Sequence, residues 1–346
     1  MRTLRLALIG FGNVGQGFAQ ILRERGDWLE EQFGLRLSIV AISDVQRGSL
    51  YAPTGLDPRA LLSAIETTGY LNDLPAAHHG WDAHATITDT NADVVIELTY
   101  TNLQTGEPAA SHIRWALESG KHVVTTNKGP IALHFPELYR LAQDKQLEIG
   151  VEGTVMSGTP VLRLGREMLA AAGIQHIQGI LNGTSNYILT QIEAGATYAS
   201  ALAEAQAKGY AEADPTGDVE GYDAAGKVII LANLLMGAPL TMADVDRTGI
   251  TAIGAQDFEQ ARASGQCWKL IGTVERVNGE IKASVRPVRL DVRHPLATVK
   301  GATNAIIYHT DLLGDVMVSG PGAGRQETGF ALICDLLSIH RSLSRL

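Results

Sequence analysis

The chain has 346 residues, of which 45% are hydrophobic and 19% are charged, a composition typical of a globular protein with a sizeable core. Its formal net charge is −9, from 37 acidic and 28 basic residues without a Lys/Arg cluster, so we expect neither nucleic acid nor a membrane as a partner. The apolar runs are interrupted well before the ~20 residues that a membrane-spanning helix needs. Cys267 and Cys334 are isolated, which indicates neither a disulfide framework nor a zinc site, and we expect a cytoplasmic protein.

The N-terminus predicts a buried strand over residues 4–9 that runs into a glycine-rich turn and then a helix. In this strand–turn–helix context the pattern GxGxxG is typical of a dinucleotide-binding fold. The first glycine permits the tight turn, the second lets a pyrophosphate approach the backbone, and the third lets helix and strand pack closely. The alternative is a glycine-rich turn that binds no cofactor. The residues expected to bind the cofactor are Gly10, Phe11, Gly12, Asn13, Val14 and Gly15.

The second predicted strand, residues 37–43, carries two conflicting signals about the cofactor at its end. Asp44 follows the strand directly, and an acid at this position usually binds the adenosine ribose of NAD. Arg47 lies three residues further on and would instead meet the 2′-phosphate of NADP. The sequence therefore leaves the choice between NAD and NADP open.

Residues 45–90 are polar and rich in turns, which predicts an insertion with one short helix near residues 58–66. An alternation of strands and helices then resumes, with strands at 94–98 and 121–127 and helices near 107–118 and 134–145. Thr99 and Lys128 follow the two strands, at the carboxyl ends where open α/β sheets bind ligands. For Lys128 the alternative is a solvated loop residue. The alternation predicts a Rossmann-type, doubly wound sheet.

The alternation weakens after residues 147–153, a further predicted strand. Glu152 opens the run GTVMSGTP, which is poor in side-chain donors and rich in main-chain carbonyls. One carboxylate and several carbonyl oxygens could hold a hard cation, although a simple strand–helix turn explains the same residues. A helix (160–171), a strand (176–181) and a turn (182–186) that opens another helix are expected next.

Residues 208–227 concentrate acidic side chains ahead of one lysine. Pro and Gly break the first half into turns, and helical spacing of apolar residues begins at about Tyr222. Asp223 and Lys227 therefore lie one turn apart on one helix face. Such a pair could hold a small polar substrate and exchange a proton with it, whereas the alternative is an ordinary i,i+4 ion pair. The acidic residues are Glu212, Asp214, Asp218, Glu220 and Asp223.

The C-terminal third predicts more strands. Asn278-Gly279 between two alternating runs is a strong hairpin signal, and residues 302–310 and 314–320 are two further strands. A second glycine-rich turn precedes a final helix that extends to about Leu343 and could return to cover the nucleotide. We place a dinucleotide-binding domain at 1–150, completed by about 305–346. An α+β domain with a mixed sheet, for substrate binding and dimerisation, occupies 151–304.

Over nearly its whole length the chain resembles homoserine dehydrogenases. The two most specific motifs are NGTSNYIL and the acidic stretch. The chain is similar to the short form, without an aspartate-kinase region or an ACT domain. The motifs occur in the family's order and are GFGNVG (10–15), VVTTNKGPIA (123–132), EGTVMSGTP (152–160), NGTSNYIL (182–189), AKGYAEADPTGDVEGYDAAGK (207–227) and GPGAG (320–324).

The resemblance implies the NAD(P)-dependent interconversion of L-homoserine and L-aspartate 4-semialdehyde. It implies that Lys227 is the proton donor to the aldehyde oxygen and that Lys128 lies near both nicotinamide and substrate. The resemblance also implies roles for the remaining residues. They are Glu212, Asp218 and Asp223 for the substrate, Gly209, Gly322 and Gly324 for the cofactor, and Glu152, Val155, Ser157 and Thr159 for a structural sodium ion. Thr99 is expected to bind the cofactor because of its position after the strand 94–98.

Two segments depart from the family pattern, namely residues 325–331 after the second glycine-rich turn and Glu97-Leu98-Thr99-Tyr100 in place of a short Gly-containing turn. Both are expected near the cofactor. The alternatives to this family are another NAD(P)-dependent amino-acid dehydrogenase of similar fold, and a non-catalytic NAD(P) sensor. The hairpin-rich sheet of the second domain is suited to pairing across a two-fold axis, so we expect a homodimer.

Overall fold

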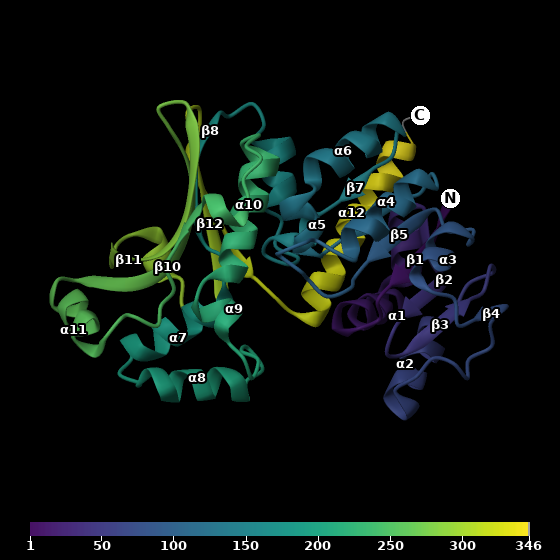
Figure 1. The fold of residues 1–346 in the computed structure, drawn as a ribbon, viewed down its shortest axis with the longest axis horizontal. Coiled ribbons are helices and arrows are strands. Elements are labelled where there is room, and N and C mark those ends of the chain that lie inside the picture. Colours follow the sequence, from purple (N-terminus) through teal and green to yellow (C-terminus); the bar gives the residue numbers. More distant parts are fainter. Residues whose placement is uncertain (345–346) are drawn as a thin grey trace. The chain divides into compact units, whose positions relative to one another are not determined.

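A computed structural model describes residues 1–344. The described chain forms two compact units, one made of Met1–Gly158 together with the C-terminal segment that starts at Gly324, and one made of Thr159–Ala323. Among the described residues, no helix has both the length and the apolar character that crossing a membrane requires. Each unit has its own sheet, and the two are described separately below (Figure 1).

The first unit is built on a seven-stranded sheet of order β4-β3-β2-β1-β5-β6-β7. The strands β2, β1, β5, β6 and β7 are parallel neighbours, and the chain passes from β1 to β2 on one side and later to β5 on the other. The predicted doubly wound sheet is therefore confirmed. The strands are β1 (Arg2–Ile9), β2 (Leu35–Asp44), β3 (Gly48–Tyr51), β4 (His78–His79), β5 (Val94–Glu97), β6 (His122–Thr125) and β7 (Ile149–Gly150).

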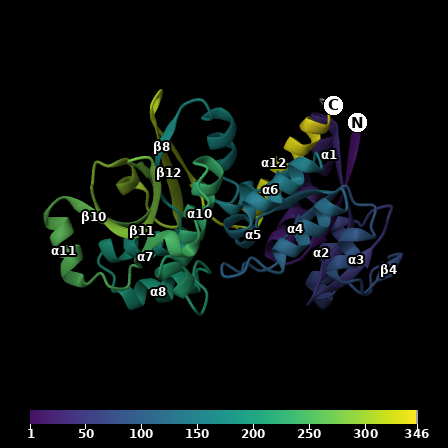
Figure 2. The same ribbon diagram turned by 45° about the horizontal axis from the view of Figure 1, so that its top comes forward.

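Helices connect these strands and pack on the sheet. The C-terminal helix, yellow in Figures 1 and 2, packs against the first helix of the chain and belongs to the same unit. The core consists of aliphatic residues of the strands and of the helices that cover them, together with Phe11 and Phe18. The helices are α1 (Asn13–Phe33), α2 (Pro58–Thr68), α3 (Ala83–Thr88), α4 (Ala109–Glu118), α5 (Lys128–Leu133), α6 (Phe135–Asp144) and α12 (Arg325–Leu343), and a 3-10 turn spans Glu152–Thr154.

The segment 45–90 is more than the predicted insertion with one helix. It adds strands β3 and β4 antiparallel to the edge of the sheet, and it contributes α3 in addition to α2. Strand β3 has four residues and β4 has two, which is too short for an alternating pattern to stand out from a turn-rich background.

The second unit is built on a six-stranded sheet of order β13-β12-β8-β10-β11-β9, in which only the β11–β9 pair is parallel. The hairpin predicted at Asn278-Gly279 is confirmed, because β10 and β11 pair in continuous register on either side of it. The strands are β8 (Ile174–Ile180), β9 (Val245–Arg247), β10 (Gln266–Val277), β11 (Glu280–Asp291), β12 (Thr303–Thr310) and β13 (Gly314–Pro321).

Helices α7 and α10 pack against strands of this sheet. The helix predicted at 160–171 is replaced largely by a π-helical turn at Leu164–Met168, a backbone form that apolar spacing does not distinguish from an α-helix. The α-helices are α7 (Gly183–Glu193), α8 (Tyr198–Ala207), α9 (Thr216–Val219), α10 (Tyr222–Leu235) and α11 (Ala255–Ala263), and 3-10 turns span Met242–Asp244 and Pro295–Thr298.

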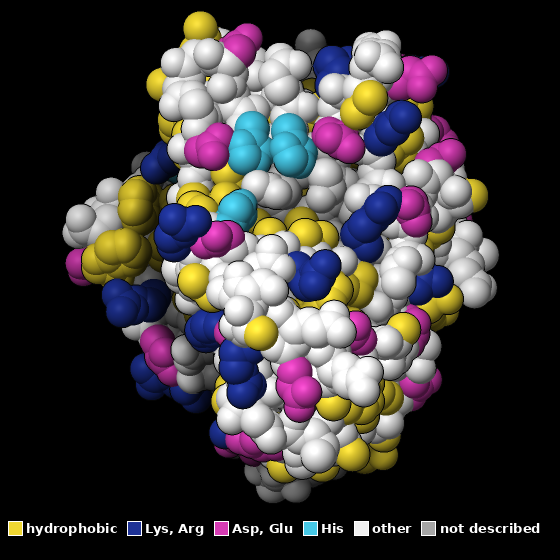
Figure 3. Space-filling model, turned by 90° about the vertical axis from the view of Figure 1, so that its left-hand side faces the viewer, with side chains coloured by type: hydrophobic (Ala, Val, Ile, Leu, Met, Phe, Trp, Pro, Cys, Tyr) yellow, Lys and Arg dark blue, Asp and Glu magenta, His cyan; other side chains and the backbone are white. Residues whose placement is uncertain are grey.

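The boundary between the units differs from the one drawn from sequence. Residues 305–323, which the sequence analysis places in the nucleotide domain, belong to the second unit, because β12 pairs with β8 and β13 pairs with β12. Only the segment that starts at Gly324 joins the first unit. The face drawn in Figure 3 shows basic and acidic side chains interspersed among neutral ones, without a continuous basic area.

A buried lysine stabilises the second unit through two hydrogen bonds. Lys269 of β10 is fully buried, and its Nζ donates to Asn186 Oδ1 at 3.0 Å and to the Val299 main-chain oxygen at 2.6 Å. Asn186 of α7 in turn donates to the main-chain oxygens of Gly301 and Thr303. These contacts connect helix α7, strand β10 and the chain that enters β12.

Lys269 gives the unfolding free energy a dependence on alkaline pH. Burial lowers the pKa of Lys269 from 10.5 to about 8, so between these values the unfolded chain binds more protons than the folded chain. Stability should therefore rise with pH in this window, by up to about 3 kcal/mol relative to Lys269→Met. Denaturant unfolding of both proteins at pH 7.5, 9 and 10.5 measures the difference. If the unfolding free energies of the two proteins changed in parallel with pH, the lowered pKa of Lys269 would be contradicted.

Candidate active site

The glycine-rich turn of the first unit fits a dinucleotide. Gly10 has φ of 100°, and a Cβ there would lie 2.8 Å from the main-chain oxygen of Leu98, so the position requires glycine. Gly12 precedes helix α1, and a Cβ built on it would meet no atom within 4 Å. This open space lies at a helix N-terminus without a side-chain cap. A pyrophosphate can accept hydrogen bonds from the backbone N–H groups at such a position.

The structure brings Asp44 and Arg47 together at the end of β2. Asp44 Oδ2 accepts from the Phe11 main-chain N–H at 2.7 Å, so the acid is fixed to the glycine-rich turn. Its Oδ1 accepts from the N–H groups of Gln46 and Arg47, each at 2.9 Å. The Arg47 guanidinium lies 3.9 Å from Asp44 Oδ2. The two conflicting signals of the sequence are therefore neighbours, and the arginine faces the carboxylate.

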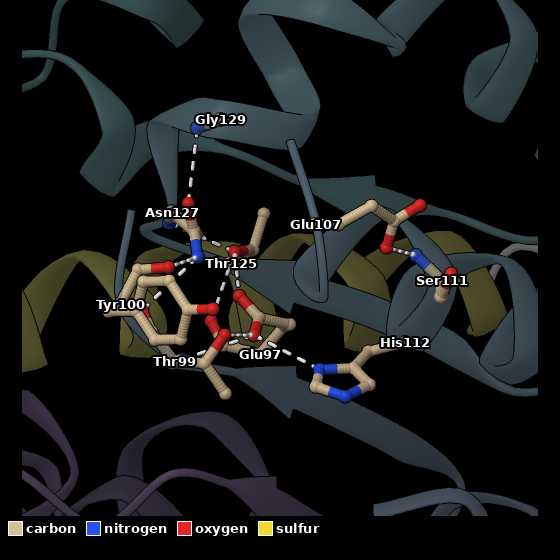
Figure 4. Close-up of polar contacts among 9 residues, drawn as sticks. All are labelled: Glu97, Thr99, Tyr100, Glu107, Ser111, His112, Thr125, Asn127 and Gly129. Atoms are coloured by element: carbon tan, nitrogen blue, oxygen red, sulfur yellow. Dashed lines mark hydrogen bonds and ion pairs between the residues drawn. The ribbon is translucent and has the colours of Figure 1, made fainter. Parts of the chain in front are cut away.

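The ends of β5 and β6 are tied together by side chains that Figure 4 shows in close-up. Glu97 at the end of β5 is fully buried and accepts from both the N–H and the hydroxyl of Thr99. Asn127 donates from Nδ2 to the main-chain oxygens of Thr99 and Tyr100, at 3.1 and 3.0 Å. Its Oδ1 accepts from Gly129 and caps helix α5, whose first residue is Lys128. The positions of Thr99 and Lys128 thus depend on Asn127.

The second unit holds the predicted lysine–carboxylate pair. Lys227 is 7% exposed, and its Nζ donates to Asp223 Oδ2 at 2.7 Å and to the main-chain oxygen of Leu181 at 2.6 Å. Asn182 Nδ2 bridges the two acids, with distances of 2.6 Å to Asp218 Oδ1 and 3.0 Å to Asp223 Oδ2. Lys227, Asp223 and Asp218 therefore lie in one hydrogen-bonded cluster.

The electrostatics of this cluster favour a cationic ligand. Burial raises the pKa of Asp218, the charge of Asp223 raises it further, and the Asn182 hydrogen bond and the Lys227 charge act in the opposite direction. Two neighbouring carboxylates are costly to keep ionised, and a substrate ammonium group would relieve that cost. A lysine beside them can hold or release a proton at Nζ.

The other predicted residues are more dispersed. Glu212 is exposed on the loop before α9, and among residues 1–344 it is not part of the hydrogen bonds around Lys227. Gly209 ends helix α8 with φ of 72°. Gly322 packs against the Asn304 side chain in the second unit, whereas Gly324 precedes helix α12 in the first.

The run from Glu152 to Thr159 has an unusual backbone. Met156 and Ser157 have φ of 56° and 54°, a left-handed conformation that is uncommon for such residues. Glu152 is buried, and its N–H donates to Asp335 of α12 at 3.0 Å. Ser157 belongs to the first unit, whereas Thr159 opens the second and donates to Pro321. One carboxylate with hydroxyl and carbonyl oxygens is a donor set for a hard cation. Within the described chain, no group of three or more His, Cys, Asp or Glu residues could hold a metal ion.

Sequence reasoning missed three residues of these clusters. Leu181 and Asn182 are more than 35 residues from the acids and lysine that they contact. The sequence places Asn182 only in a turn that opens a helix, with Thr184 or Ser185 as the expected cap, whereas the structure has Asn182 as the N-cap. Glu97 was noted only as part of a departure from the family pattern, because at the end of an apolar strand it resembles a surface residue.

A Rossmann-type unit with this glycine-rich turn, and a second unit with a buried lysine–carboxylate cluster, define an NAD(P)-dependent oxidoreductase of a small polar substrate. Comparison with known proteins narrows the class. The family models "Homoserine dehydrogenase, NAD binding domain" and "Homoserine dehydrogenase" match residues 10–152 and 160–337. The chain belongs to the homoserine dehydrogenase family.

Individual relatives agree with this assignment. The chain is 49% identical to an NAD(+)-dependent homoserine dehydrogenase of Pseudomonas canavaninivorans, over 100% of this chain and 98% of the relative. It is 38% identical to a homoserine dehydrogenase of Methanocaldococcus jannaschii, over 98% of this chain and 99% of the relative.

Solved structures are similar along the whole chain. A homoserine dehydrogenase from Thiobacillus denitrificans has a TM-score of 0.86 at 32% identity, covering 100% of this chain and 75% of that one. A hyperthermophilic archaeal homoserine dehydrogenase in complex with NADPH has a TM-score of 0.84 at 28% identity, covering 99% of this chain and 98% of that one. These comparisons favour neither a different amino-acid dehydrogenase nor a non-catalytic sensor.

Proposed function

We propose that the protein interconverts L-homoserine and L-aspartate 4-semialdehyde with NAD as the preferred cofactor and Lys227 as the proton donor and acceptor. The observation that carries the proposal is the buried Lys227, held between Asp223 and the Leu181 carbonyl beside Asp218. A lysine with this surrounding, in a chain of the homoserine dehydrogenase family, supports a role in proton transfer.

Each residue of the cluster has a chemical role in this proposal. The nicotinamide, when bound, supplies the hydride to the aldehyde carbon or accepts it from homoserine. Lys227 Nζ neutralises the negative charge that develops on the substrate oxygen and donates its proton there, and in the reverse direction the neutral amine takes up the hydroxyl proton. Asp218 and Asp223, with Glu212 from the exposed loop, bind the α-ammonium group of the substrate. Asn182 holds the two aspartates in place.

The preference for NAD is supported by the surroundings of Asp44. Its carboxylate is fixed at the end of β2 by the Phe11 N–H, the position from which an acid binds the adenosine ribose. The negative charge of Asp44 would repel the 2′-phosphate of NADP, and the Arg47 guanidinium lies beside the Asp44 carboxylate. A relative that is 49% identical is named as NAD(+)-dependent, which agrees with the proposal.

Asp44→Asn should lower the preference for NAD over NADP by about 10-fold or more, since a hydrogen bond to a charged group contributes about 1.5–3 kcal/mol. The asparagine Oδ1 can still accept from the Gln46 and Arg47 N–H groups, whereas its NH2 group cannot accept from the Phe11 N–H. The ratio of kcat/KM for the two cofactors measures the change. Arg47→Gln is the matched control and should alter the NADP value alone; an unchanged ratio in Asp44→Asn would exclude the carboxylate as the determinant.

The direct test of the reaction is absorbance of the reduced nicotinamide with purified protein, L-homoserine and either NAD or NADP. Homoserine-dependent reduction of NAD, faster than that of NADP, is the expected result. If neither cofactor is reduced by a protein that still binds cofactor, the substrate assignment is wrong.

Four further properties belong to the same proposal. We propose that Glu152, Val155, Ser157 and Thr159 hold a structural sodium ion, which the oxygen-only donors and the left-handed backbone at Met156 and Ser157 support. A homodimer formed through the second unit's sheet, a cytoplasmic location, and a place in threonine, methionine and isoleucine biosynthesis are proposed from the family. Light scattering tests the dimer, and thermal unfolding in sodium against potassium chloride tests the ion.

A further inference from the structure

Glu97 is a buried acid at the end of a cofactor-binding strand, outside the cluster around Lys227. None of its surface is exposed. Its Oε1 accepts from the Thr99 N–H at 3.1 Å and lies 3.4 Å from Nδ1 of His112 on α4. Thr125 Oγ1 of β6 lies 3.4 Å from Oε2 (Figure 4). Burial of a carboxyl group is costly, so three elements of the fold contribute partners to keep it there.

These contacts determine where the hydroxyl proton of Thr99 points. A main-chain N–H can only donate, so the Glu97 Oε1 that contacts the Thr99 N–H is an acceptor. Thr99 Oγ1 contacts the same oxygen, and the hydroxyl must therefore donate its single proton to Glu97. The lone pairs of Thr99 Oγ1 are left as an acceptor for another group.

Thr99 stands where the nicotinamide half of the cofactor is expected. The strand order reverses at β1, between β2 and β5, and dinucleotides bind outside the carboxyl ends of the strands at such a point. Leu98, the residue before Thr99, contacts the glycine-rich turn at Gly10. Since Asp44 on β2 belongs to the adenosine side, the β5 side faces the nicotinamide.

We infer that Glu97 is a positioning residue that makes Thr99 a hydrogen-bond acceptor for the carboxamide N–H of the nicotinamide. The inference deepens the proposed function and rests on its NAD(P) dependence. The carboxamide offers two N–H donors, and an acceptor fixed by a buried acid selects the orientation that presents one of them. In Glu97→Met no oxygen remains to accept from Thr99, which frees the hydroxyl proton and removes the preference for an acceptor. Glu97→Gln would not do this, because the Thr99 N–H requires the amide oxygen at the Oε1 position. Asn127 holds the same segment through the carbonyls of Thr99 and Tyr100.

The test compares NADH with reduced 3-acetylpyridine adenine dinucleotide, whose acetyl group replaces the carboxamide and has no N–H. Affinities are measured by cofactor fluorescence without an amino-acid substrate. The wild type should bind NADH more tightly. Glu97→Met and Thr99→Val should each weaken NADH binding by about 10-fold and the analogue by less than about 2-fold, the range of one hydrogen bond. Thr99→Ser, which keeps the hydroxyl, should retain the wild-type ratio.

Glu107→Met is the matched control, because Glu107 accepts from the Ser111 N–H at 3.1 Å and is drawn apart from the Glu97 contacts in Figure 4. It should keep the wild-type ratio. Equal losses for both nucleotides in Thr99→Val, or no loss for either, would overturn the inference. If Glu97→Met does not fold, the Thr99→Val and Thr99→Ser pair decides. Because no amino acid is present, a failed homoserine assay would count against the proposed reaction and leave this result standing.

Discussion

Lys227→Ala should lower kcat for homoserine oxidation by about 10²–10⁴-fold, the contribution of a positioned acid–base group. Lys227 is 7% exposed, and its Nζ contacts Asp223 and the Leu181 carbonyl at 2.7 and 2.6 Å, so neither water nor a neighbouring lysine replaces it easily. The glycine-rich turn belongs to the other unit and does not depend on this side chain. NAD affinity should stay within about 2-fold of wild type, since the change removes no cofactor contact. Initial rates and cofactor fluorescence measure the two quantities.

Two variants distinguish the loss of proton transfer from the loss of positive charge at position 227. Lys227→Arg keeps a cation, but a guanidinium does not release its proton in proteins, so turnover should stay as low as in the alanine variant. Lys300→Ala removes a surface lysine paired with Glu193 and should leave turnover unchanged. Wild-type turnover in a folded Lys227→Ala protein, shown by its circular dichroism spectrum, would remove Lys227 from the mechanism.

Local sequence patterns predicted the parts of the site that lie within one turn of each other. Asp223 and Lys227 are four residues apart, so helical spacing alone placed them on one face, and the structure gives a contact of 2.7 Å. Asn182 and Leu181 join the same cluster from more than 35 residues away. No spacing rule reaches that far, because the contact depends on where the chain before α7 lies relative to α10.

The same distinction explains what was missed in the fold. Long apolar strands and the Asn278-Gly279 turn are local signals, and β1, β2 and the β10–β11 hairpin were predicted from them. Strands β12 and β13 were also predicted, but they were assigned to the first unit because the sequence does not state that β12 pairs with β8. Glu97 was passed over for a related reason, since its burial depends on partners from α4 and β6.

Asp218→Asn should raise KM for homoserine by roughly 30-fold or more, the effect of removing one partner of a buried charge pair. Asp218 shares Asn182 with Asp223, and together the two acids bind the substrate ammonium in the proposed site. The asparagine has nearly the same shape and can still accept from Asn182, so KM for NAD should not change. Steady-state kinetics with each substrate varied in turn measures both constants, and an unchanged KM for homoserine would exclude Asp218 from substrate binding.

The same substitution should leave the protein without substrate at least as stable as the wild type at neutral pH. Burial, with the charge of Asp223, raises the pKa of Asp218 above 3.8, so the folded chain binds this proton more readily than the unfolded chain. The wild type therefore carries a cost above the folded pKa, and this cost disappears as the pH falls below about 4, the pKa of an unfolded aspartate. The neutral asparagine side chain of the variant carries no such cost, so the stability gain of Asp218→Asn should be present at pH 7 and vanish towards pH 4.

Asp214→Asn is the matched control for this stability measurement, since hydrogen bonds from Thr216 lower the pKa of the exposed Asp214 carboxyl. The pH dependence of stability then has the opposite sign. The Asp214 carboxylate stabilises the folded chain at neutral pH, and that contribution is lost as the pH falls through the lowered pKa. Asp214→Asn should therefore gain no stability at pH 7 and keep the KM for homoserine. Denaturant midpoints of the three proteins at pH 7, pH 4.5 and pH 3 test whether stability changes with pH in opposite directions for the two acids. A loss of stability in Asp218→Asn at pH 7 would mean that the carboxylate holds the fold together. The expected gain would mean that the acid is kept, at a cost in stability, to bind the substrate.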